Sequence, residues 1–238
     1  MNRSRARSPR GMEIVVVSIG GSVLLPRIVE TQYIKTLAKM LADASRGANI
    51  FAVVGAGWIA RFYKDLGLEL GCGEATLDEN GIAVTRLNAS LLIAALGARA
   101  NPKPALTIDE AISMASKYDI VVMGGEKPGQ TTDAVAAQIA ARTGAVRVVN
   151  ATDVDGVYDS DPRKNPKAKR IDAMTFAQFA QMCGKARHSP GMHVPFDPSG
   201  ARLVSRKKIV TIILDGKDLA SFKGAILGSK YRGTTVEG

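Results

Sequence analysis

Glycine, hydroxyl and carboxylate residues gather in a few segments that follow runs of β-branched residues. Three of these segments are residues 18–22 (SIGGS), 55–61 (GAGWIAR) and 124–133 (GGEKPGQTTD). Glycine has no Cβ and lets backbone N–H groups approach a ligand closely, and a helix N-terminus adds a positive dipole end. A lone Gly-Gly-Ser is ordinary turn chemistry. Three such segments together indicate phosphate binding.

Standard phosphate motifs do not describe these segments. None has the Gly-Lys-Ser/Thr ending of a Walker A loop, and none is a GxGxxG dinucleotide fingerprint. In the third segment Thr131 or Thr132 can cap a helix, Asp133 falls in its first turn, and Gly144 can end it. Simple capping would explain the threonines, but not the Gly-Gly-x-x-Pro-Gly loop before them.

The elements that must position these segments alternate along the chain. Runs of β-branched residues predict strands over Glu13–Ser18, Ile50–Val54, Asp119–Met123, Val146–Asn150 and Ile209–Leu214. Helical composition and periodicity predict helices over Gln32–Ala44, Trp58–Leu70, Ile82–Leu96, Asp109–Ser116 and Asp133–Arg142. This alternation predicts a three-layer α/β/α fold with a mostly parallel central sheet. Ligands of such sheets bind beyond the carboxyl ends of the strands, where the glycine segments lie.

Charge and composition narrow the class of ligand. The chain of 238 residues has a net charge of +10, and residues 163–208 hold eleven Lys or Arg against Asp172 and Asp197. One Trp and no aromatic-rich basic strand disfavour a base-stacking surface for nucleic acid. A basic half of this kind favours small polyanionic substrates, with no specific nucleic-acid partner.

The cysteines and the local hydropathy of the chain indicate its cellular compartment and the nature of its N-terminal segment. Cys72 and Cys183 have no metal-ligand spacing, so we expect a reducing cytoplasm, no disulfide framework and no protein-borne metal site. No apolar run approaches the roughly 20 residues of a membrane span, so we expect no membrane partner. Residues 1–11, which hold four arginines and no apolar stretch, are expected to form a disordered basic tail.

The order of the motifs resembles the amino acid kinase family, and within it the uridylate (UMP) kinases of archaeal type. The motifs are GGS at 20–22, VGAGWIAR at 54–61, LDENGIAVTRLNA at 77–89, GGEKPGQTTDAVAA at 124–137, TDVDGVYDSDPRKNP at 152–166 and GTTV at 233–236. The resemblance covers residues 12–238. It implies a kinase domain with an acceptor-binding part over about 12–145 and an ATP-binding part over about 146–238.

The resemblance also implies roles for individual residues. ATP is expected to be bound by Gly21, Ser22, Gly57, Arg61, Thr152, Asp153, Tyr158 and Asp161. UMP is expected to be bound by Ala56, Asp78, Glu126, Lys127, Pro128, Gly129, Gln130, Thr131 and Thr132. Catalysis is assigned to Asp133, Arg61 and Lys164, with Mg²⁺ carried mainly by the ATP phosphates. The implied reaction is transfer of the γ-phosphoryl group of ATP to UMP in pyrimidine nucleotide biosynthesis, by a homohexamer built as a trimer of dimers.

Several assigned residues have an ordinary structural explanation as well. Tyr158 is equally suited to the core, and Asp153 and Asp161 are common turn residues. Asp78 can cap the helix that follows it. The sequence also departs from the family pattern: Ser18 stands where many kinases of this fold have Lys, Ala56 where relatives have a third glycine, and Trp58 where a small or basic residue is usual.

Other functions remain compatible with the sequence. Molybdate-storage subunits of the same fold also carry a Gly-Ala-Gly second loop, so a non-catalytic nucleotide or oxyanion storage protein is one alternative. A sister kinase for carbamate or isopentenyl phosphate is another. The isopentenyl phosphate kinases use a histidine near the acceptor phosphate, whereas the only histidines here are His188 and His193, in a Pro/Gly-rich loop over 186–198 of open role. A nucleic-acid regulator is the weakest alternative.

Overall fold

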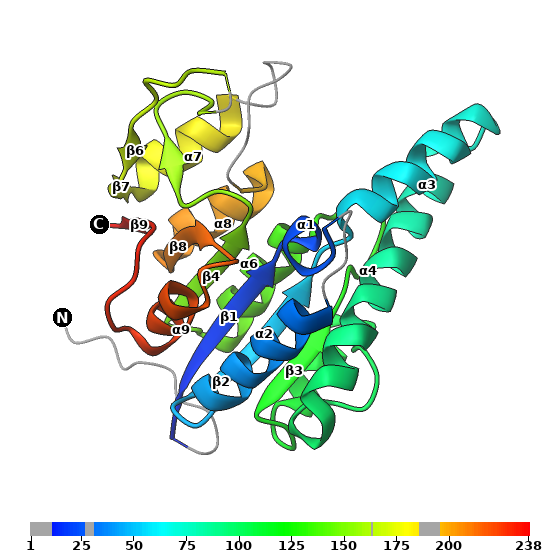
Figure 1. Ribbon diagram of the computed structural model, residues 1–238, viewed down its shortest axis with the longest axis horizontal. Coiled ribbons are helices and arrows are strands. Elements are labelled where there is room, and N and C mark those ends of the chain that lie inside the picture. Colours follow the sequence, from blue (N-terminus) through cyan, green and yellow to red (C-terminus); the bar gives the residue numbers. More distant parts are fainter. Residues whose placement is uncertain (1–10, 27–30, 163, 186–195) are drawn as a thin grey trace.

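A seven-stranded, mostly parallel sheet forms the centre of the protein (Figure 1). The computed structural model describes residues 11–26, 31–162, 164–185 and 196–238. In sheet order the strands are β3 (Ile120–Met123), β2 (Ala48–Val54), β1 (Glu13–Ile19), β4 (Arg147–Thr152), β8 (Val210–Asp215), β9 (Thr234–Glu237) and β7 (Ala173–Thr175). The first five of these strands are parallel to one another, whereas β9 pairs antiparallel with β8, and β7, which is parallel to β9, runs in that opposite direction as well. The predicted fold class is therefore confirmed.

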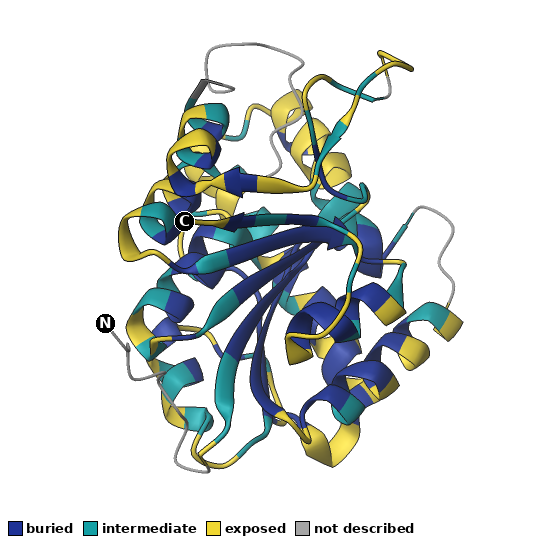
Figure 2. Cartoon of the chain, turned by 90° about the vertical axis from the view of Figure 1, so that its left-hand side faces the viewer, coloured by how far each residue is buried: buried dark blue, intermediate teal, exposed yellow. Residues whose placement is uncertain are grey.

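Helices cover both faces of this sheet. Their bounds are α1 (Gly21–Leu24), α2 (Thr31–Ala44), α3 (Gly57–Glu69), α4 (Glu74–Leu96), α5 (Ile108–Met114), α6 (Thr132–Thr143), α7 (Phe176–Lys185), α8 (Pro198–Lys207) and α9 (Leu219–Leu227), with a 3-10 turn η1 (Gly97–Arg99). Strand side chains alternate between the two faces, and those of β1, β2 and β4 are buried on both, which is typical of a parallel sheet (Figure 2).

Two hydrophobic cores result from this alternation. One core joins Val15 and Val17 of β1 to Leu37 of α2, Leu92 of α4 and Phe222 of α9. The other joins Val16 of β1 and Phe51 of β2 to side chains of α5, α6, α7 and α8. Each face of the sheet is thus covered by its own helical layer, and the carboxyl ends of β1, β2, β3 and β4 lie at one edge.

All ten predicted strands and helices are present, with one substantial difference. Helix α4 begins at Glu74, eight residues before the expected Ile82, and its N-cap is Gly73 with no side-chain cap. The extra turns are stabilised by packing on α3, where a Cβ added at Gly67 would lie 2.5 Å from Leu77 Cδ2. Since Asp78 lies inside this helix, the interpretation of Asp78 as an N-cap is wrong.

Helix α4 bears on the expectation that the chain has no membrane span. Among the described residues, Glu74–Arg99 is the one helical segment long and apolar enough, by length and composition, to cross a membrane. Its polar side chains bond to loops of the same domain: Asn88 Nδ2 donates to the carbonyl oxygens of Gly55 and Ala56 at 2.9 and 3.1 Å. The contacts identify α4 as a packed helix of this fold.

A small two-stranded sheet lies beside the main one and consists of β5 (Val157–Tyr158) and β6 (Arg170–Ile171). Thr234 of the GTTV segment joins the two sheets, because its hydroxyl accepts from Val157 N at 2.7 Å and donates to Ile171 O at 2.5 Å. Gly156 must be glycine there, since a Cβ would lie 2.7 Å from the same hydroxyl. The basic tail, apart from Gly11, and both histidines lie outside the described residues.

Candidate functional site

The first two glycine loops pack directly against each other, backbone on backbone. A Cβ added at Gly21 would lie 2.1 Å from Gly57 N, and one added at Gly57 would lie 2.6 Å from Gly21 C. Gly57 also has a φ of +70°, which disfavours any residue with a side chain. The glycines are therefore required for contact between the loops. This contact brings the start of α1 and the start of α3 together.

The third loop ends in a well-capped helix that delivers Asp133. Thr131 is the N-cap of α6 and accepts from Ala134 N at 3.2 Å, and Gly144 ends the helix with a φ of +66°. Both helix ends agree with the sequence prediction. Asp133, in the first turn, accepts a hydrogen bond of 2.7 Å from the buried hydroxyl of Ser18 near the end of β1.

The environment of Asp133 makes its carboxyl unusual. Protein atoms surround the carboxyl densely, although part of the residue still reaches solvent. This burial raises the pKa of Asp133 to about 6, against the opposing effect of the Ser18 hydrogen bond, and the charge of Asp197 at the N-terminus of α8 raises it further. Such a group at the carboxyl edge of the sheet is typical of a functional carboxylate.

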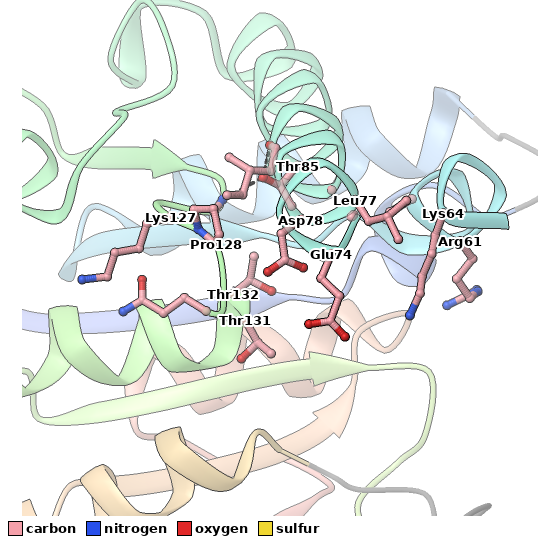
Figure 3. A pocket seen from close by; sticks show the side chains of 16 residues that line it. Arg61, Lys64, Glu74, Leu77, Asp78, Thr85, Lys127, Pro128, Thr131 and Thr132 are labelled. Carbon is pink, nitrogen blue, oxygen red and sulfur yellow. Dashed lines mark hydrogen bonds between the residues drawn. The ribbon is translucent and has the colours of Figure 1, made fainter. Parts of the chain in front are cut away.

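A cavity of about 570 Å³ opens between α3, α4 and the third loop. Two charge types face each other across it. Glu74 and Asp78 project from successive turns of α4, while Arg61 and Lys64 project from successive turns of α3 (Figure 3). Within the described part of the chain, Arg61 and Lys64 make no ion pair. The cavity therefore offers two cations for anionic groups and carboxylates for hydroxyl groups.

Asp78 is held in this cavity by the third loop. Its Oδ2 accepts from Gly129 N at 2.7 Å, across 51 residues of sequence. Gly129 has a φ of +74°, so the loop turns there in a conformation that favours glycine. The second carboxylate oxygen of Asp78 makes no hydrogen bond to the described residues and can accept one from a ligand hydroxyl.

A second cavity, of about 440 Å³, lies beside the small sheet and contains several aspartates. Its walls include Asp153, Asp155, Tyr158, Asp218 and Arg232. Tyr158 donates to Asp155 Oδ1 at 2.6 Å, and Arg170 Nη1 and Arg232 Nη2 lie 3.2 and 2.8 Å from Asp155 Oδ2. Asp155 therefore fixes the phenol of Tyr158 against the cavity wall.

These partners determine the protonation of Asp155. Partial burial by itself would raise the pKa of this carboxyl, but the Tyr158 hydrogen bond and the guanidinium of Arg232 lower it below its ordinary value. Asp155 is thus a charged anchor at neutral pH. The sequence interpretation chose its neighbour Asp153, which also lines the cavity.

Most of the residues expected at the acceptor side lie together. The first cavity is lined by Ala56, Arg61, Asp78, Lys127, Pro128, Gln130, Thr131 and Thr132. Arg61, which was expected to bind ATP phosphates, lines the same cavity as these residues expected to bind UMP. Glu126 is not in the lining, because its carboxylate instead accepts from Ile108 N at 2.8 Å at the start of α5.

Several of the residues expected to bind ATP line neither of the two cavities. Asp153 and Tyr158 line the second cavity, whereas Asp161 and Lys164 line neither of the two. Asp161 O accepts from Lys164 N and Asn165 N in a turn, at 3.0 and 2.9 Å. The hydroxyl oxygen of Thr152 accepts a hydrogen bond from Val154 N at 3.0 Å.

The sequence interpretation missed some residues of the first cavity. These are Ala60, Lys64, Glu74, Leu77, Gly81, Ile82, Thr85 and Gly125. Two of them carry a signal that helical spacing provides: Lys64 is three residues after Arg61 and Glu74 four residues before Asp78. Glu74 could be placed beside Asp78 only if α4 was known to begin at residue 74, and the sequence pattern predicted a start at Ile82.

Comparison with known proteins places this geometry in a class. The model of the amino acid kinase family matches residues 13–215, and the chain belongs to this family. It is 41% identical to a uridylate kinase of Haloquadratum walsbyi over 222 residues, covering 93% of this chain and 92% of the relative. It is 42% identical to a uridylate kinase of Methanocorpusculum labreanum, covering 94% and 96% of the two chains.

Solved structures agree with the family assignment. The crystal structure of a uridylate kinase from Archaeoglobus fulgidus matches with a TM-score of 0.85 and 37% identity, covering 94% of this chain and all of that one. A UMP kinase from Bacillus anthracis matches with a TM-score of 0.76 but only 20% identity, which supports the fold alone.

Proposed function

We propose that this protein is an ATP-dependent UMP kinase, which transfers the γ-phosphoryl group of ATP to UMP and supplies UDP for pyrimidine nucleotide synthesis. The observation that carries the proposal is the meeting of paired glycine loops, a cationic and carboxylate-bearing cavity, and the Ser18–Asp133 pair at one edge of the sheet. Identity of 40–42% to uridylate kinases over nearly the whole chain supports the same conclusion.

The acceptor nucleotide is assigned to the first cavity. Phosphoryl transfer requires two nucleotides in line and neutralisation of charge, with little covalent chemistry from the protein. We assign the UMP phosphate to Arg61, Lys64 and the N-terminus of α6, and the ribose hydroxyls to Asp78. The loop over 126–132 is assigned to the base. This leaves the region up to about residue 145 as the acceptor-binding part of the domain.

ATP is assigned to the other half of the edge. The ring of Tyr158, held by Asp155, offers a face for the adenine, and Asp153 offers an acceptor for hydroxyl groups. The N–H groups of Gly21, Ser22 and Gly57 are assigned to the ATP phosphates, between the two cavities. Thr152, Asp161 and Lys164 complete the proposed ATP-binding part over about 146–238.

Magnesium fits this donor set as a companion of ATP. Among the residues that the structure describes, no three His, Cys, Asp or Glu side chains come together as a metal site. Mg²⁺ commonly binds through phosphates plus one or two carboxylates, and Asp133 supplies one such oxygen ligand. Bound with ATP, Mg²⁺ would neutralise charge on the phosphoryl oxygens.

A coupled assay of ADP release tests the proposal. UMP, CMP, dCMP, dTMP, carbamate and isopentenyl phosphate are compared as acceptors with Mg²⁺-ATP, against a reaction without acceptor. We expect UMP to give by far the highest kcat/KM. ADP release with UMP no faster than without acceptor, together with turnover of another acceptor, would identify a sister kinase; tight binding without any turnover would indicate storage.

Arg61→Ala is expected to lower kcat/KM for UMP about 10- to 100-fold, because loss of a charge-assisted contact costs about 1.5–3 kcal/mol. The KM for ATP should change less, since Arg61 lines the acceptor cavity. Steady-state kinetics with each substrate varied in turn measure both effects. Arg99→Ala is the matched control, because Arg99 is an exposed arginine in η1, just after α4. If Arg61→Ala matches this control for both substrates, Arg61 has no part in phosphate binding.

Asp78→Asn is expected to raise the KM for UMP and leave the KM for ATP nearly unchanged. An amide oxygen accepts more weakly than a carboxylate from ribose hydroxyls, yet can still accept from Gly129 N. The preference for UMP over dUMP should shrink in the same variant. Thermal melting is the control: a lower Tm with unchanged UMP discrimination would reduce Asp78 to an anchor of the loop.

We also propose a cytoplasmic homohexamer, a trimer of dimers. Exposed aromatic side chains on α3, Phe62 and Tyr63, are 52% and 49% accessible in the single chain and are suited to a subunit interface. Cys72 and Cys183 are both free thiols, as expected in a reducing compartment. Analytical ultracentrifugation measures the oligomeric state.

A further inference from the structure

Two consecutive residues of α4, Thr85 and Arg86, hold the third glycine loop in place; Thr85 lines the first cavity and Arg86 does not. Thr85 is buried, and its hydroxyl donates to Ile82 O at 2.6 Å and accepts from Gly125 N at 2.7 Å. Arg86 donates from Nε to Gly125 O and from Nη2 to Glu126 O, each at 3.3 Å. Both peptide groups of Gly125 are therefore fixed by α4.

The close contact between this loop and α4 depends on the backbone of Gly124. A Cβ added at Gly124 would lie 2.4 Å from Thr85 Oγ1 and 2.8 Å from Thr85 C, so only glycine permits the approach. Arg86 Nη2 also reaches Leu106 O at 3.3 Å, which ties the loop to the start of α5. Within the described chain Arg86 pairs with no carboxylate, because Glu126 bonds to Ile108 N instead. Among the described residues, the guanidinium of Arg86 donates hydrogen bonds to backbone carbonyl oxygens alone.

The direction of these carbonyls determines the direction of the following amides. In a trans peptide the C=O and N–H groups point opposite ways, and the described chain has no cis bonds. Since the carbonyls of Gly125 and Glu126 point at Arg86, the N–H groups of Glu126 and Lys127 point away from it. Neither N–H has a hydrogen-bond partner among the described residues, and Gly125 and Lys127 line the cavity.

We propose that Arg86 is the residue that sets the base selectivity of the acceptor site, by holding the N–H groups of Glu126 and Lys127 as donors for the edge of the base. The inference rests on the proposed UMP kinase activity. Uracil carries a carbonyl acceptor at position 4, whereas cytosine carries an amino donor there. Donor N–H groups therefore bind uracil and are left unpaired against the amino group of cytosine, which is penalised.

Gln130 adds a hydrogen-bond acceptor to the N–H donors of Glu126 and Lys127. It lines the same cavity, and its side-chain oxygen is buried without a partner among the described residues. A buried acceptor of this kind needs a donor, and uracil supplies one at N3–H. The cavity thus offers donors for the carbonyl of uracil and an acceptor for its imide N–H. Arg86 acts as a positioning residue, because it does not line the cavity.

Kinetics and binding with UMP and CMP test the role of Arg86. Wild type, Arg86→Ala, Arg86→Lys and the control Arg46→Ala are compared, with each nucleotide and ATP varied in turn; Arg46 is an exposed arginine in the turn that follows α2. Arg86→Ala is expected to lower the ratio of kcat/KM for UMP to that for CMP at least about tenfold, with the KM for ATP within about twofold. Calorimetric Kd values for UMP and CMP should show the same change of ratio.

Each outcome separates the inference from the proposed activity. Wild type that turns over neither nucleotide defeats the proposed function. Wild type that uses UMP and CMP equally overturns the inference alone, as does a loss of the same size for both in the Arg86 variants. If Arg86→Ala does not fold by circular dichroism, Arg86→Lys decides, because a single ammonium cannot hold three carbonyls and should still reduce the ratio.

Discussion

Replacing Asp133 by Asn is expected to lower kcat about 10²- to 10³-fold while KM for ATP and UMP changes little. The carboxylate lies at the edge where the two proposed nucleotide sites meet, hydrogen-bonded to Ser18 at 2.7 Å. Removing one oriented electrostatic group of this kind affects the transition state more than the ground state. Asn keeps the size of the side chain, so the change removes charge with little effect on packing. Steady-state kinetics with Mg²⁺-ATP and UMP measure the effect.

The pH profile provides the control for this prediction. Because the pKa of Asp133 is raised to about 6, kcat/KM of wild type should fall as the pH is lowered through 6, where the carboxyl becomes neutral. The Asn variant should lose the part of this decline that comes from Asp133 and keep only the part that comes from the UMP phosphate, whose second pKa is also about 6. If a folded Asp133→Asn enzyme retains a kcat near that of wild type, Asp133 is a helix-terminal residue with no part in the transfer.

Local patterns in the sequence were sufficient for the five strands β3, β2, β1, β4 and β8 and for the cap of α6, but not for the short strands β9 and β7. The predicted strands need only a run of β-branched residues, and the Thr131 cap and Gly144 terminus need only neighbours in the chain. The first turns of α4 could not be predicted in this way. Gly71, Gly73 and Gly81 lie before and within this segment, and the helical form of residues 74–81 depends on packing of Leu77 against Gly67 of α3.

The composition of the site depended on contacts between distant segments. The motifs indicated loops near one another, but not the inter-loop contact that requires Gly21 and Gly57. Asp155 was passed over for Asp153, because its role comes from Arg170 and Arg232, which are 15 and 77 residues away. Lys164 was chosen from the motif alone, and the structure places it in neither cavity.

Asp133→Asn is also expected to make the ligand-free protein more stable at pH 8, by about 2 kcal/mol in the free energy of unfolding. The folded state raises the pKa of Asp133 from 3.8 to about 6, so above pH 6 wild type must keep an unfavourable charge in a low-dielectric site. A shift of about two pKa units corresponds to about 3 kcal/mol, which partial solvent access reduces. Asn carries no charge and avoids this cost.

The sign of the effect makes the prediction testable by pH. A carboxyl with a raised folded-state pKa binds protons more tightly when folded, so its contribution to stability is lost as the pH rises from about 4 through 6. The advantage of the Asn variant should therefore be largest at pH 8, about half as large at pH 5, and absent below the unfolded pKa. Urea unfolding of both proteins at pH 5 and pH 8 measures the difference. An equal advantage at both pH values would attribute it to packing, and a less stable variant at pH 8 would show that the Asp133 charge is paired favourably in the folded protein.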